Sequence, residues 1–408
     1  MAQRPYPVIT VNEKAARSLR GGHPWVYGAE TTGPDRPCEN GDLVDVVTQK
    51  GRWLGTGFLN DHSKIRVRLI SRNTNDKFDA AFWRRRLQYA LDYRAVVMGP
   101  DVSASRLIFG EADQFPGLTV DLFHDVLVTE VLSLGMEKIK HILYPQLVEL
   151  LADRGIRVRA IYERNEAALR EKEGLPREKG FYPLPGLETN LDGHLILTEN
   201  GIKYDVDYIG GQKTGFFLDQ KYNRRAAAAL APGRRVLDCF THTGAFALNC
   251  AQGGAAHVTA VDISQDAVEL TRRNASLNGL EDKVDAIQAD VFDLLTDLAR
   301  GKGHPYDYII LDPPAFTKSG ATVKNAYRGY KEINLKAMKL LPRGGYLATC
   351  SCSHFMTAPL FCQMLREAAA DAAVSLRQIE DRRQSPDHPI LWGVPETEYL
   401  KFYLFQIV

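Results

Sequence analysis

The sequence predicts an α/β protein whose C-terminal half is a doubly wound, Rossmann-like domain. Three observations carry this prediction. Strands and helices alternate regularly from about residue 235 onward, short glycine-separated strands fill the first 72 residues, and a stretch of mixed character lies between them. Regular β-α-β alternation is typical of a parallel sheet with helices on both faces. The length of 408 residues is enough for about two to four domains.

The first predicted domain covers residues 1–72 and is a small β-barrel. Its predicted strands are 43–47, 53–59 and 65–69. The last of them alternates apolar residues with Arg66 and Arg68, as a half-buried strand does. We expect both arginines to point outward, where they either contact RNA or are simply solvated. The domain holds eleven Lys and Arg against seven Asp and Glu, a net charge of +4 that is compatible with phosphate contacts.

A central α+β domain is predicted over residues 73–185. Apolar residues at helical spacing between Trp83 and Arg94 predict a helix, and a glycine-rich turn follows at 110–117. The remaining predicted elements are strands at 118–122, 126–132 and 160–163 and a helix at 137–152. The Pro and Gly residues of 182–186 mark a linker to the next domain.

The third predicted domain, residues 186–408, begins with a β-hairpin at about 190–215 and continues as the doubly wound sheet. Its predicted strands are 235–238, 258–262, 284–288, 308–311 and 345–349, its predicted helices are 243–252, 265–278, 292–300 and 327–341, and further elements are expected at 358–373 and 398–408. Ligands of such sheets bind at the carboxyl ends of the strands. We therefore expect the functional residues directly after these strands.

Composition narrows the functional classes. Hydrophobic residues make up 45% and charged residues 25% of the chain, which is ordinary for a globular protein. No apolar run reaches the roughly 18 residues of a membrane span, and the first ten residues lack the apolar stretch of a secretory signal. The six cysteines are dispersed and form no pair of Cys-x-x-Cys motifs. We expect a reducing, cytoplasmic compartment and no metal site.

A cofactor site is predicted from aspartates at three successive strand ends. The loop 238–244, Asp-Cys-Phe-Thr-His-Thr-Gly, opens a helix but has no pyrophosphate cradle, which indicates a nucleoside cofactor without phosphate. We expect Asp238 to face the ammonium at the methionine end of S-adenosylmethionine. Asp262 would accept hydrogen bonds from both ribose hydroxyls, and Asp290 would read the adenine amine. Helix N-capping is the alternative role for these aspartates.

The catalytic prediction rests on a cysteine pair after the strand at 345–349. A thiolate that adds to carbon 6 of a cytosine makes carbon 5 enamine-like, so that carbon 5 can take a methyl group from a sulfonium. Spacing alone does not choose between Cys350 and Cys352. Asp312, which opens the Asp-Pro-Pro-Ala-Phe segment at 312–316, could hydrogen-bond the exocyclic amine and the protonated ring nitrogen. Cys239, Cys250 and Cys362 are interpreted as small buried hydrophobes.

Taken together, the motifs resemble those of bacterial large-subunit ribosomal RNA cytosine-C5 methyltransferases that carry an N-terminal PUA domain. The resemblance covers nearly the whole chain, and the matching stretches are 22–27, 41–47, 110–121, 161–164, 211–220 and 387–389. It implies that Ser351-Cys352-Ser353 is the family's Ser-Cys-Ser motif, with Cys352 as nucleophile and Cys350 as a bystander. Better-known cytosine-C5 RNA methyltransferases use a second cysteine after the proline that follows the fourth strand. This chain has Pro314-Ala315 there, so the group that removes the carbon-5 proton stays open, a bound water being one option.

The resemblance also extends the predicted cofactor site. The implied contacts to S-adenosylmethionine are Gln220, Asp238, Phe240, Thr243, Gly244, Asp262, Ser264, Asp290 and Asp312. We expect large-subunit ribosomal RNA as the partner and no membrane, and a homodimer is one assembly that the sequence leaves open. Two alternatives remain: a methyltransferase that acts on a guanine nitrogen, which needs no thiolate, and a non-catalytic RNA-binding protein.

Overall fold

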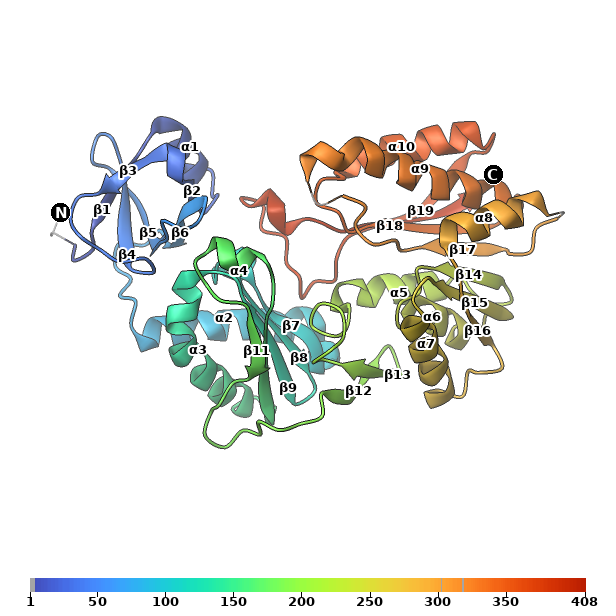
Figure 1. The fold of residues 1–408 in the computed structure, drawn as a ribbon, viewed down its shortest axis with the longest axis horizontal. Helices are drawn as coiled ribbons and strands as arrows, with labels where there is room; N and C mark the ends of the chain where they lie inside the picture. The colour runs from blue at the N-terminus through green and yellow to red at the C-terminus, as the bar shows by residue number, and fades with distance from the viewer. Residues whose placement is uncertain (1–3, 302, 318) are drawn as a thin grey trace. The chain divides into compact units, whose positions relative to one another are not determined.

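The computed structural model describes residues 4–301, 303–317 and 319–408, so the predicted start of the first domain at residues 1–3 lies outside the described residues. The chain forms two compact units (Figure 1). Unit 1 consists of Met1–Leu195, Asp207–Leu218 and Pro386–Thr397, and unit 2 consists of Ile196–Val206, Asp219–Ser385 and Glu398–Val408. Each unit is described separately below.

The N-terminal part of unit 1 is a six-stranded sheet with the order β2-β6-β5-β4-β1-β3. Its elements are β1 (Val8–Val11), α1 (Glu13–Arg20), β2 (Trp25–Tyr27), β3 (Thr31–Pro34), β4 (Leu43–Thr48), β5 (Trp53–Leu59) and β6 (Ile65–Ser71). The three predicted strands correspond to β4, β5 and β6. The sequence did not reveal β1, β2 and β3 because three or four residues are too few for an alternation signal. Ile9, Val26 and Val67 are fully buried in the core of this sheet.

The central part of unit 1 is a five-stranded sheet with the order β11-β10-β9-β8-β7. Its elements are α2 (Ala80–Met98), β7 (Ala104–Phe109), β8 (Leu118–Phe123), β9 (Val126–Val131), α3 (Leu134–Ala152), β10 (Ala160–Asn165), α4 (Leu169–Lys172) and β11 (Glu178–Phe181). Asp79 caps α2 by accepting a hydrogen bond from the Phe82 backbone N–H. Trp83 of α2 is stacked against Phe58 of β5 with parallel rings 6.2 Å apart, so the two sheets of unit 1 share part of their core.

Arg68 does not point into solvent as predicted. Its guanidinium donates two hydrogen bonds, of 2.8 and 3.0 Å, to the Glu173 carboxylate, and the two side chains are only 11% and 5% exposed. Arg66, on the same strand, forms a more exposed ion pair with Asp61. The strand alternation placed both arginines on one face correctly, but the segment around Glu173 covers the Arg68 end of that face. Arg68 therefore lies in a largely buried ion pair within unit 1.

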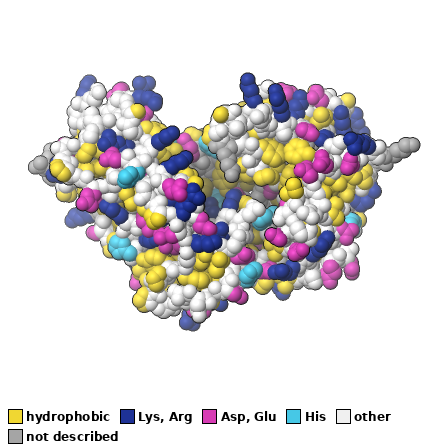
Figure 2. Space-filling view, in the orientation of Figure 1, with side chains coloured by type: hydrophobic (Ala, Val, Ile, Leu, Met, Phe, Trp, Pro, Cys, Tyr) yellow, Lys and Arg dark blue, Asp and Glu magenta, His cyan; other side chains and the backbone are white. Residues whose placement is uncertain are grey.

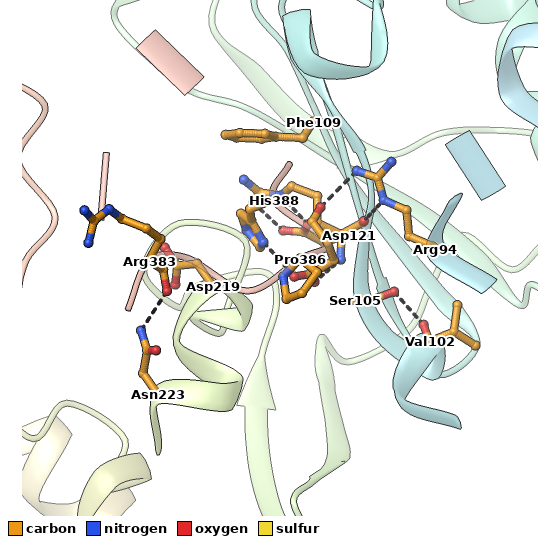
Figure 3. A network of polar contacts seen from close by, with 12 residues as sticks. Arg94, Val102, Ser105, Phe109, Asp121, Asp219, Asn223, Arg383, Pro386 and His388 are labelled. Carbon is orange, nitrogen blue, oxygen red and sulfur yellow. Dashed lines mark hydrogen bonds and ion pairs between the residues drawn. The ribbon is translucent and has the colours of Figure 1, made fainter. Parts of the chain in front are cut away.

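A buried polar network connects two further segments of unit 1 to the central sheet. The Arg94 guanidinium binds the Asp387 carbonyl, and the Asp387 carboxylate accepts a 2.8 Å hydrogen bond from the Arg106 backbone N–H. His388 Nδ1 lies 3.0 Å from the other oxygen of that carboxylate. Figure 3 shows Arg94, Asp121 and His388 gathered in this network. Both Arg106 and the Thr214 hydroxyl donate to the Asp121 carboxylate, which fixes the 211–220 motif at Thr214.

Unit 2 contains a seven-stranded sheet with the order β16-β15-β14-β17-β18-β20-β19. The elements are α5 (Lys221–Ala228), β14 (Arg235–Cys239), α6 (Ala245–Gln252), β15 (His257–Asp262), α7 (Gln265–Leu277), β16 (Val284–Gln288), α8 (Val291–Arg300), β17 (Tyr308–Leu311), α9 (Val323–Leu340), β18 (Tyr346–Ser351), α10 (Ala358–Asp371), β19 (Leu376–Arg382) and β20 (Lys401–Ile407). Helices α5, α6 and α7 cover one face and α8, α9 and α10 the other (Figure 1). The predicted doubly wound α/β architecture is confirmed. Two short strands, β12 (His194–Glu199) and β13 (Ile202–Asp207), pair where the hairpin is predicted.

One strand departs from the predicted parallel sheet. β20 lies between β18 and β19 and is antiparallel to both. The connection from β19 to β20, residues 383–400, contains only a short 3-10 turn, η6 (Pro395–Thr397), and without a crossover helix neighbouring strands pair antiparallel. As a result, Lys401 at the amino end of β20 pairs with Ser351 at the carboxyl end of β18.

The surface mixes charges of both signs. Figure 2 shows Lys and Arg side chains interspersed with Asp and Glu over the visible face of both units, in keeping with a formal net charge of +1. Among the described residues, no helix combines the length and the apolar character that crossing a bilayer would require.

Candidate active site

The carboxyl edge of the parallel strands in unit 2 carries the predicted site residues. Following the sheet order, this edge presents Asp290 after β16, Asp262 at the end of β15, Asp238 in β14, Asp312 after β17 and Cys352 after β18. Four aspartates and a cysteine from five separate stretches of sequence thus lie along one edge, because parallel strands with helical crossovers all end on the same side.

Asp238 is the most deeply buried of these carboxylates, with 1% of its surface exposed. One oxygen, Oδ2, accepts hydrogen bonds from the Thr241 hydroxyl (2.5 Å) and the Ala247 backbone N–H (3.0 Å). The other oxygen, Oδ1, is buried and has no hydrogen-bond partner among the described residues. Burial raises the pKa of Asp238 to about 7, and the charge of Asp312 acts in the same direction, whereas the Thr241 hydrogen bond opposes it. A buried carboxylate with one unpaired oxygen is poised to receive a cation.

The loop after Asp238 has an unusual backbone. Phe240 and His242 have φ angles of 64° and 53°, and Gly244, the N-cap residue before α6, has a φ of 78°. Left-handed conformations in non-glycine residues store strain and cluster at ligand sites. A Cβ at Gly244 would lie 2.7 Å from Thr271 Cγ2, so the position needs glycine for space as well as for φ. The buried Thr243 is held through its carbonyl, which accepts a 3.0 Å hydrogen bond from the Asn274 side chain.

Asp262 and Asp290 both receive backbone hydrogen bonds. The Asp262 carboxylate is half-buried and accepts from the His242 N–H (2.9 Å) and the Ser264 N–H (3.0 Å), which joins the loops after β14 and β15. Ser264 and Asp290 are exposed and act as the N-caps of α7 and α8. Of the three aspartates for which capping was the alternative, Asp290 is a helix N-cap, and Ser264 has the same role. Capping leaves further lone pairs on each side chain and does not exclude ligand binding.

Gln220 is fixed beside Asp312. Its side-chain N–H donates a 3.1 Å hydrogen bond to Asp312 Oδ1, while its own oxygen accepts a 2.6 Å hydrogen bond from the Asn223 amide. The same Asn223 amide donates to the Arg383 carbonyl at 3.1 Å, an interaction drawn in Figure 3. Gln220 is 4% exposed, so the amide of a buried residue orients the carboxylate that follows β17.

The two candidate cysteines have different surroundings. Cys350, inside β18, is fully buried, and its thiol contacts Gln220 and Asp312. Burial raises the pKa of the Cys350 thiol well above its usual value, and the Asp312 carboxylate raises it further. Cys352, directly after β18, is half-buried. A thiol that resists ionisation is a poor nucleophile, so the geometry favours Cys352. Cys239 and Cys250 are fully buried, as predicted, whereas Cys362 is half-buried and donates to the Tyr403 hydroxyl.

Hydrogen bonds connect the two residues on either side of Cys352 to three other segments of the chain. The Ser351 hydroxyl donates to the Tyr330 hydroxyl of α9 (3.1 Å), and the Ser353 hydroxyl donates to the Thr317 carbonyl (2.9 Å). The Ser353 carbonyl accepts a 2.6 Å hydrogen bond from Lys401 Nζ. Sequence reasoning missed Lys401. Its only signal is a single charge inside the apolar run Leu400-Lys401-Phe402, which becomes meaningful once β20 is known to run antiparallel to β18.

S-adenosylmethionine fits this edge by the chemistry of its groups. The unpaired Asp238 Oδ1 is the partner that an α-ammonium requires, and the Asp262 carboxylate lies one strand away, where ribose hydroxyls need acceptors. The loop between them, residues 238–244, contains no Lys or Arg that would hold a phosphate. A nucleoside cofactor that bears an ammonium matches these features better than a dinucleotide does.

Two regions of the chain match known protein families, and curated relatives match nearly its whole length. Residues 188–406 match the family of S-adenosylmethionine-dependent methyltransferases, and residues 9–72 match the PUA-like domain. The ribosomal RNA large subunit methyltransferase I of Klebsiella pneumoniae (strain 342) is 38% identical over 411 residues, with 100% of both chains covered. The protein of the same name from Shewanella denitrificans is 42% identical over 391 residues, covering 94% of this chain and 95% of its own.

Solved structures share the fold along nearly the whole chain. A structure described as a SAM-dependent methyltransferase from Streptococcus mutans superposes with a TM-score of 0.80 at 22% identity, covering 98% of this chain and 99% of its own. SMU.776, described as a methyltransferase complexed with SAH, gives the same TM-score at 21% identity, again with 98% and 99% coverage.

Proposed function

Because the chain belongs to the ribosomal RNA large subunit methyltransferase I family of S-adenosylmethionine-dependent methyltransferases, we propose that it methylates carbon 5 of a cytosine in large-subunit ribosomal RNA, with Cys352 as covalent nucleophile. S-adenosylmethionine, the cofactor of this family, supplies an electrophilic methyl group when it is bound. The residues proposed to hold it are Gln220, Asp238, Phe240, Thr243, Gly244, Asp262, Ser264, Asp290 and Asp312.

The proposed chemistry begins at the sulfur of Cys352. The thiolate forms a bond to carbon 6 of the cytosine, and the ring electrons move to carbon 5, which becomes nucleophilic. Asp312 accepts a hydrogen bond from the exocyclic amine and shares the proton on the adjacent ring nitrogen. Once carbon 5 carries the methyl group, loss of its proton to water and departure of the Cys352 thiolate restore the aromatic ring.

The way in which RNA must reach the site gives the PUA-like domain a proposed role. A base inside a helix cannot reach a strand-edge site, so the target nucleotide has to leave its stack. The PUA-like domain of unit 1 would hold flanking RNA by its shape and by single-stranded features. Within that domain, Arg66 is the more accessible of the two predicted RNA contacts, because Arg68 is committed to Glu173.

The observation that carries the proposal is the contrast between the two cysteines at the end of β18. Cys350 is buried against Gln220 and Asp312, which keeps it a thiol, whereas Cys352 is half-buried in a segment that is pinned on both sides. A methyltransferase that acts on a guanine nitrogen would not need such a cysteine. This contrast favours the cytosine reaction over that alternative.

The test is methyl transfer to ribosomal RNA by matched cysteine variants. Cys352→Ala should abolish transfer while S-adenosylhomocysteine binds with near-normal affinity in calorimetry. Cys350→Ala is the control, and it should retain most of the activity. Mass spectrometric mapping of the product should place the methyl group on carbon 5 of a cytosine. Full activity of Cys352→Ala would exclude the covalent route, and a methylated guanine would establish the competing reaction.

A further inference from the structure

Lys401 is a buried ammonium next to the proposed nucleophile. The side chain is 3% exposed, and Nζ donates hydrogen bonds to the carbonyls of Ser353 (2.6 Å) and Tyr399 (2.7 Å). Ser353 directly follows Cys352, and Lys401 pairs with Ser351 across β18 and β20. The lysine therefore reaches the segment of Cys352 from the neighbouring strand.

Within the described ranges, the Lys401 ammonium forms no ion pair with a carboxylate. In the part of the chain that the structure describes, no Asp or Glu oxygen lies within 4.0 Å of Lys401 Nζ, and both its hydrogen bonds go to neutral carbonyls. Buried lysines are rarely left without an anion, because desolvation penalises the charged form. Two carbonyl acceptors also leave one of the three N–H groups of the ammonium for another acceptor.

The anion that the site can supply is the Cys352 thiolate. Burial lowers the pKa of Lys401 to about 8, and the negative charge of a Cys352 thiolate is the largest influence that raises it again. Arg383 lowers the lysine pKa further and Glu398 raises it. A cation beside a cysteine favours the thiolate in the same reciprocal way.

Two other titratable groups that interact with Cys352 are a tyrosine and a cysteine. Tyr330 of α9 and Cys350 of β18 both interact with Cys352, and burial raises the pKa of each, so both stay neutral at pH 7. Asp312, which interacts with the same two residues, would oppose a second negative charge. Lys401 is the cation whose hydrogen bond holds Ser353, the residue that directly follows Cys352.

We infer that Lys401 is a positioning residue whose ammonium stabilises the thiolate form of Cys352 and holds the segment that bears it. The role of the Cys352 thiolate in methyl transfer to RNA rests on the proposed function. The formation of this thiolate does not depend on it. The step is a simple ionisation: the S–H bond of Cys352 breaks, the proton goes to water, and the sulfur retains the electron pair beside the Lys401 ammonium.

The experiment measures how fast iodoacetamide alkylates Cys352 in the full-length protein as a function of pH, with each cysteine followed by peptide mass spectrometry. The wild-type protein should show an inflection below the ordinary thiol value of about 8.5. In Lys401→Met, which has similar length and no charge, the inflection should move up by at least about one unit, and the thiolate fraction at pH 7 should fall about tenfold. Cys38, in unit 1, serves as the internal reference and should not change.

Two further variants separate the effect of the Lys401 charge from the effect of its hydrogen bonds to carbonyls. Lys401→Gln can still donate to carbonyls but has no charge, so it should behave like Lys401→Met. Lys401→Arg keeps the charge and should restore the wild-type inflection at least in part. Calorimetric binding of S-adenosylhomocysteine checks that all variants are folded.

Three outcomes would overturn the inference: an inflection that is the same in wild type and Lys401→Met, recovery by Gln, or no recovery by Arg in a folded protein. None of these three outcomes would contradict the proposed function. That function would be contradicted separately if Cys352→Ala remained active. Conversely, a shifted inflection would stand even if Cys352 had no role in methyl transfer.

Discussion

The Thr241 hydroxyl donates a 2.5 Å hydrogen bond to Asp238 Oδ2, while the buried Oδ1 of the same carboxylate has no partner among the residues that the structure describes. Strand β14 and the loop that follows it thus place the Asp238 carboxylate at the carboxyl edge of the sheet with only one of its two oxygens hydrogen-bonded. Since burial raises the pKa of Asp238 to about 7, this group titrates in the range where cofactor binding can be measured.

We predict that cofactor affinity depends on the charge of Asp238. Below pH 7 the carboxyl is mostly protonated and cannot pair with an ammonium, and above pH 7 it is mostly ionised. Affinity for S-adenosylhomocysteine should therefore rise about tenfold from pH 6 to pH 8, with a proton released on binding at pH 6. Calorimetry in buffers of different ionisation enthalpy measures both quantities. Asp238→Asn should bind weakly and without this pH step; a step of the same size in that variant would assign it to another group.

The same raised pKa has a consequence for stability. A carboxyl that holds its proton more tightly in the folded protein than in the unfolded chain favours folding below its unfolded value of about 4 and loses this contribution as the pH rises to about 7. Bound cofactor, by supplying a cation, should offset that loss. The gain in thermal stability on adding S-adenosylhomocysteine should accordingly be larger at pH 8 than at pH 6.

Asp262 is predicted to contribute to cofactor binding. Asp262→Ala removes a carboxylate that organises the His242 and Ser264 backbone and that would accept ribose hydroxyls. Loss of charge-assisted hydrogen bonds of about 1.5–3 kcal/mol should weaken S-adenosylhomocysteine binding roughly ten- to a hundredfold. Asp266→Ala, an exposed carboxylate in the first turn of α7, is the matched control. Equal affinity of the two variants would remove Asp262 from the site.

Gly244 should tolerate a methyl group less well than another glycine with the same backbone. Gly244→Ala and Gly233→Ala both place alanine at a φ above 70°, but only the first brings a Cβ to 2.7 Å from Thr271. We expect Gly244→Ala to destabilise unit 2 by about 1–3 kcal/mol more than Gly233→Ala does. Amide hydrogen exchange of β14 and β17 measures the difference. Equal losses would mean that the loop around Gly244 can relax.

The buried pair of Arg68 and Glu173 should be a large contributor to the stability of unit 1. Arg68→Ala leaves a carboxylate that is 5% exposed without its cation, which costs about 3–5 kcal/mol. Arg66→Ala, on the same strand, removes a more exposed pair with Asp61 and should cost at most about 1 kcal/mol. All four tryptophans lie in unit 1, so tryptophan fluorescence during urea unfolding reports this unit. Similar losses in the two variants would contradict the distinction.

The longer helices and strands could be predicted from the sequence. Apolar periodicity predicted the strand Tyr308–Leu311 and the helices around it, because buried strands and amphipathic helices repeat their pattern over several residues. The short strands β1, β2 and β3 offer no such repeat. The strand-end aspartates and the Ser-Cys-Ser segment were also visible, because a doubly wound sheet places its ligands after its strands whatever the packing details.

The sequence by itself thus determined the fold class and indicated the edge of the sheet to inspect, since both follow from patterns between residues close in the chain. Only the tertiary structure decided that Cys350 is sealed against Asp312, that Arg68 is paired with Glu173, and that Lys401 lies beside Cys352. These relationships join residues that are between 38 and 105 positions apart. Their burial and their charge partners depend on which segments cover them and on the reversed direction of β20, and no local pattern records either.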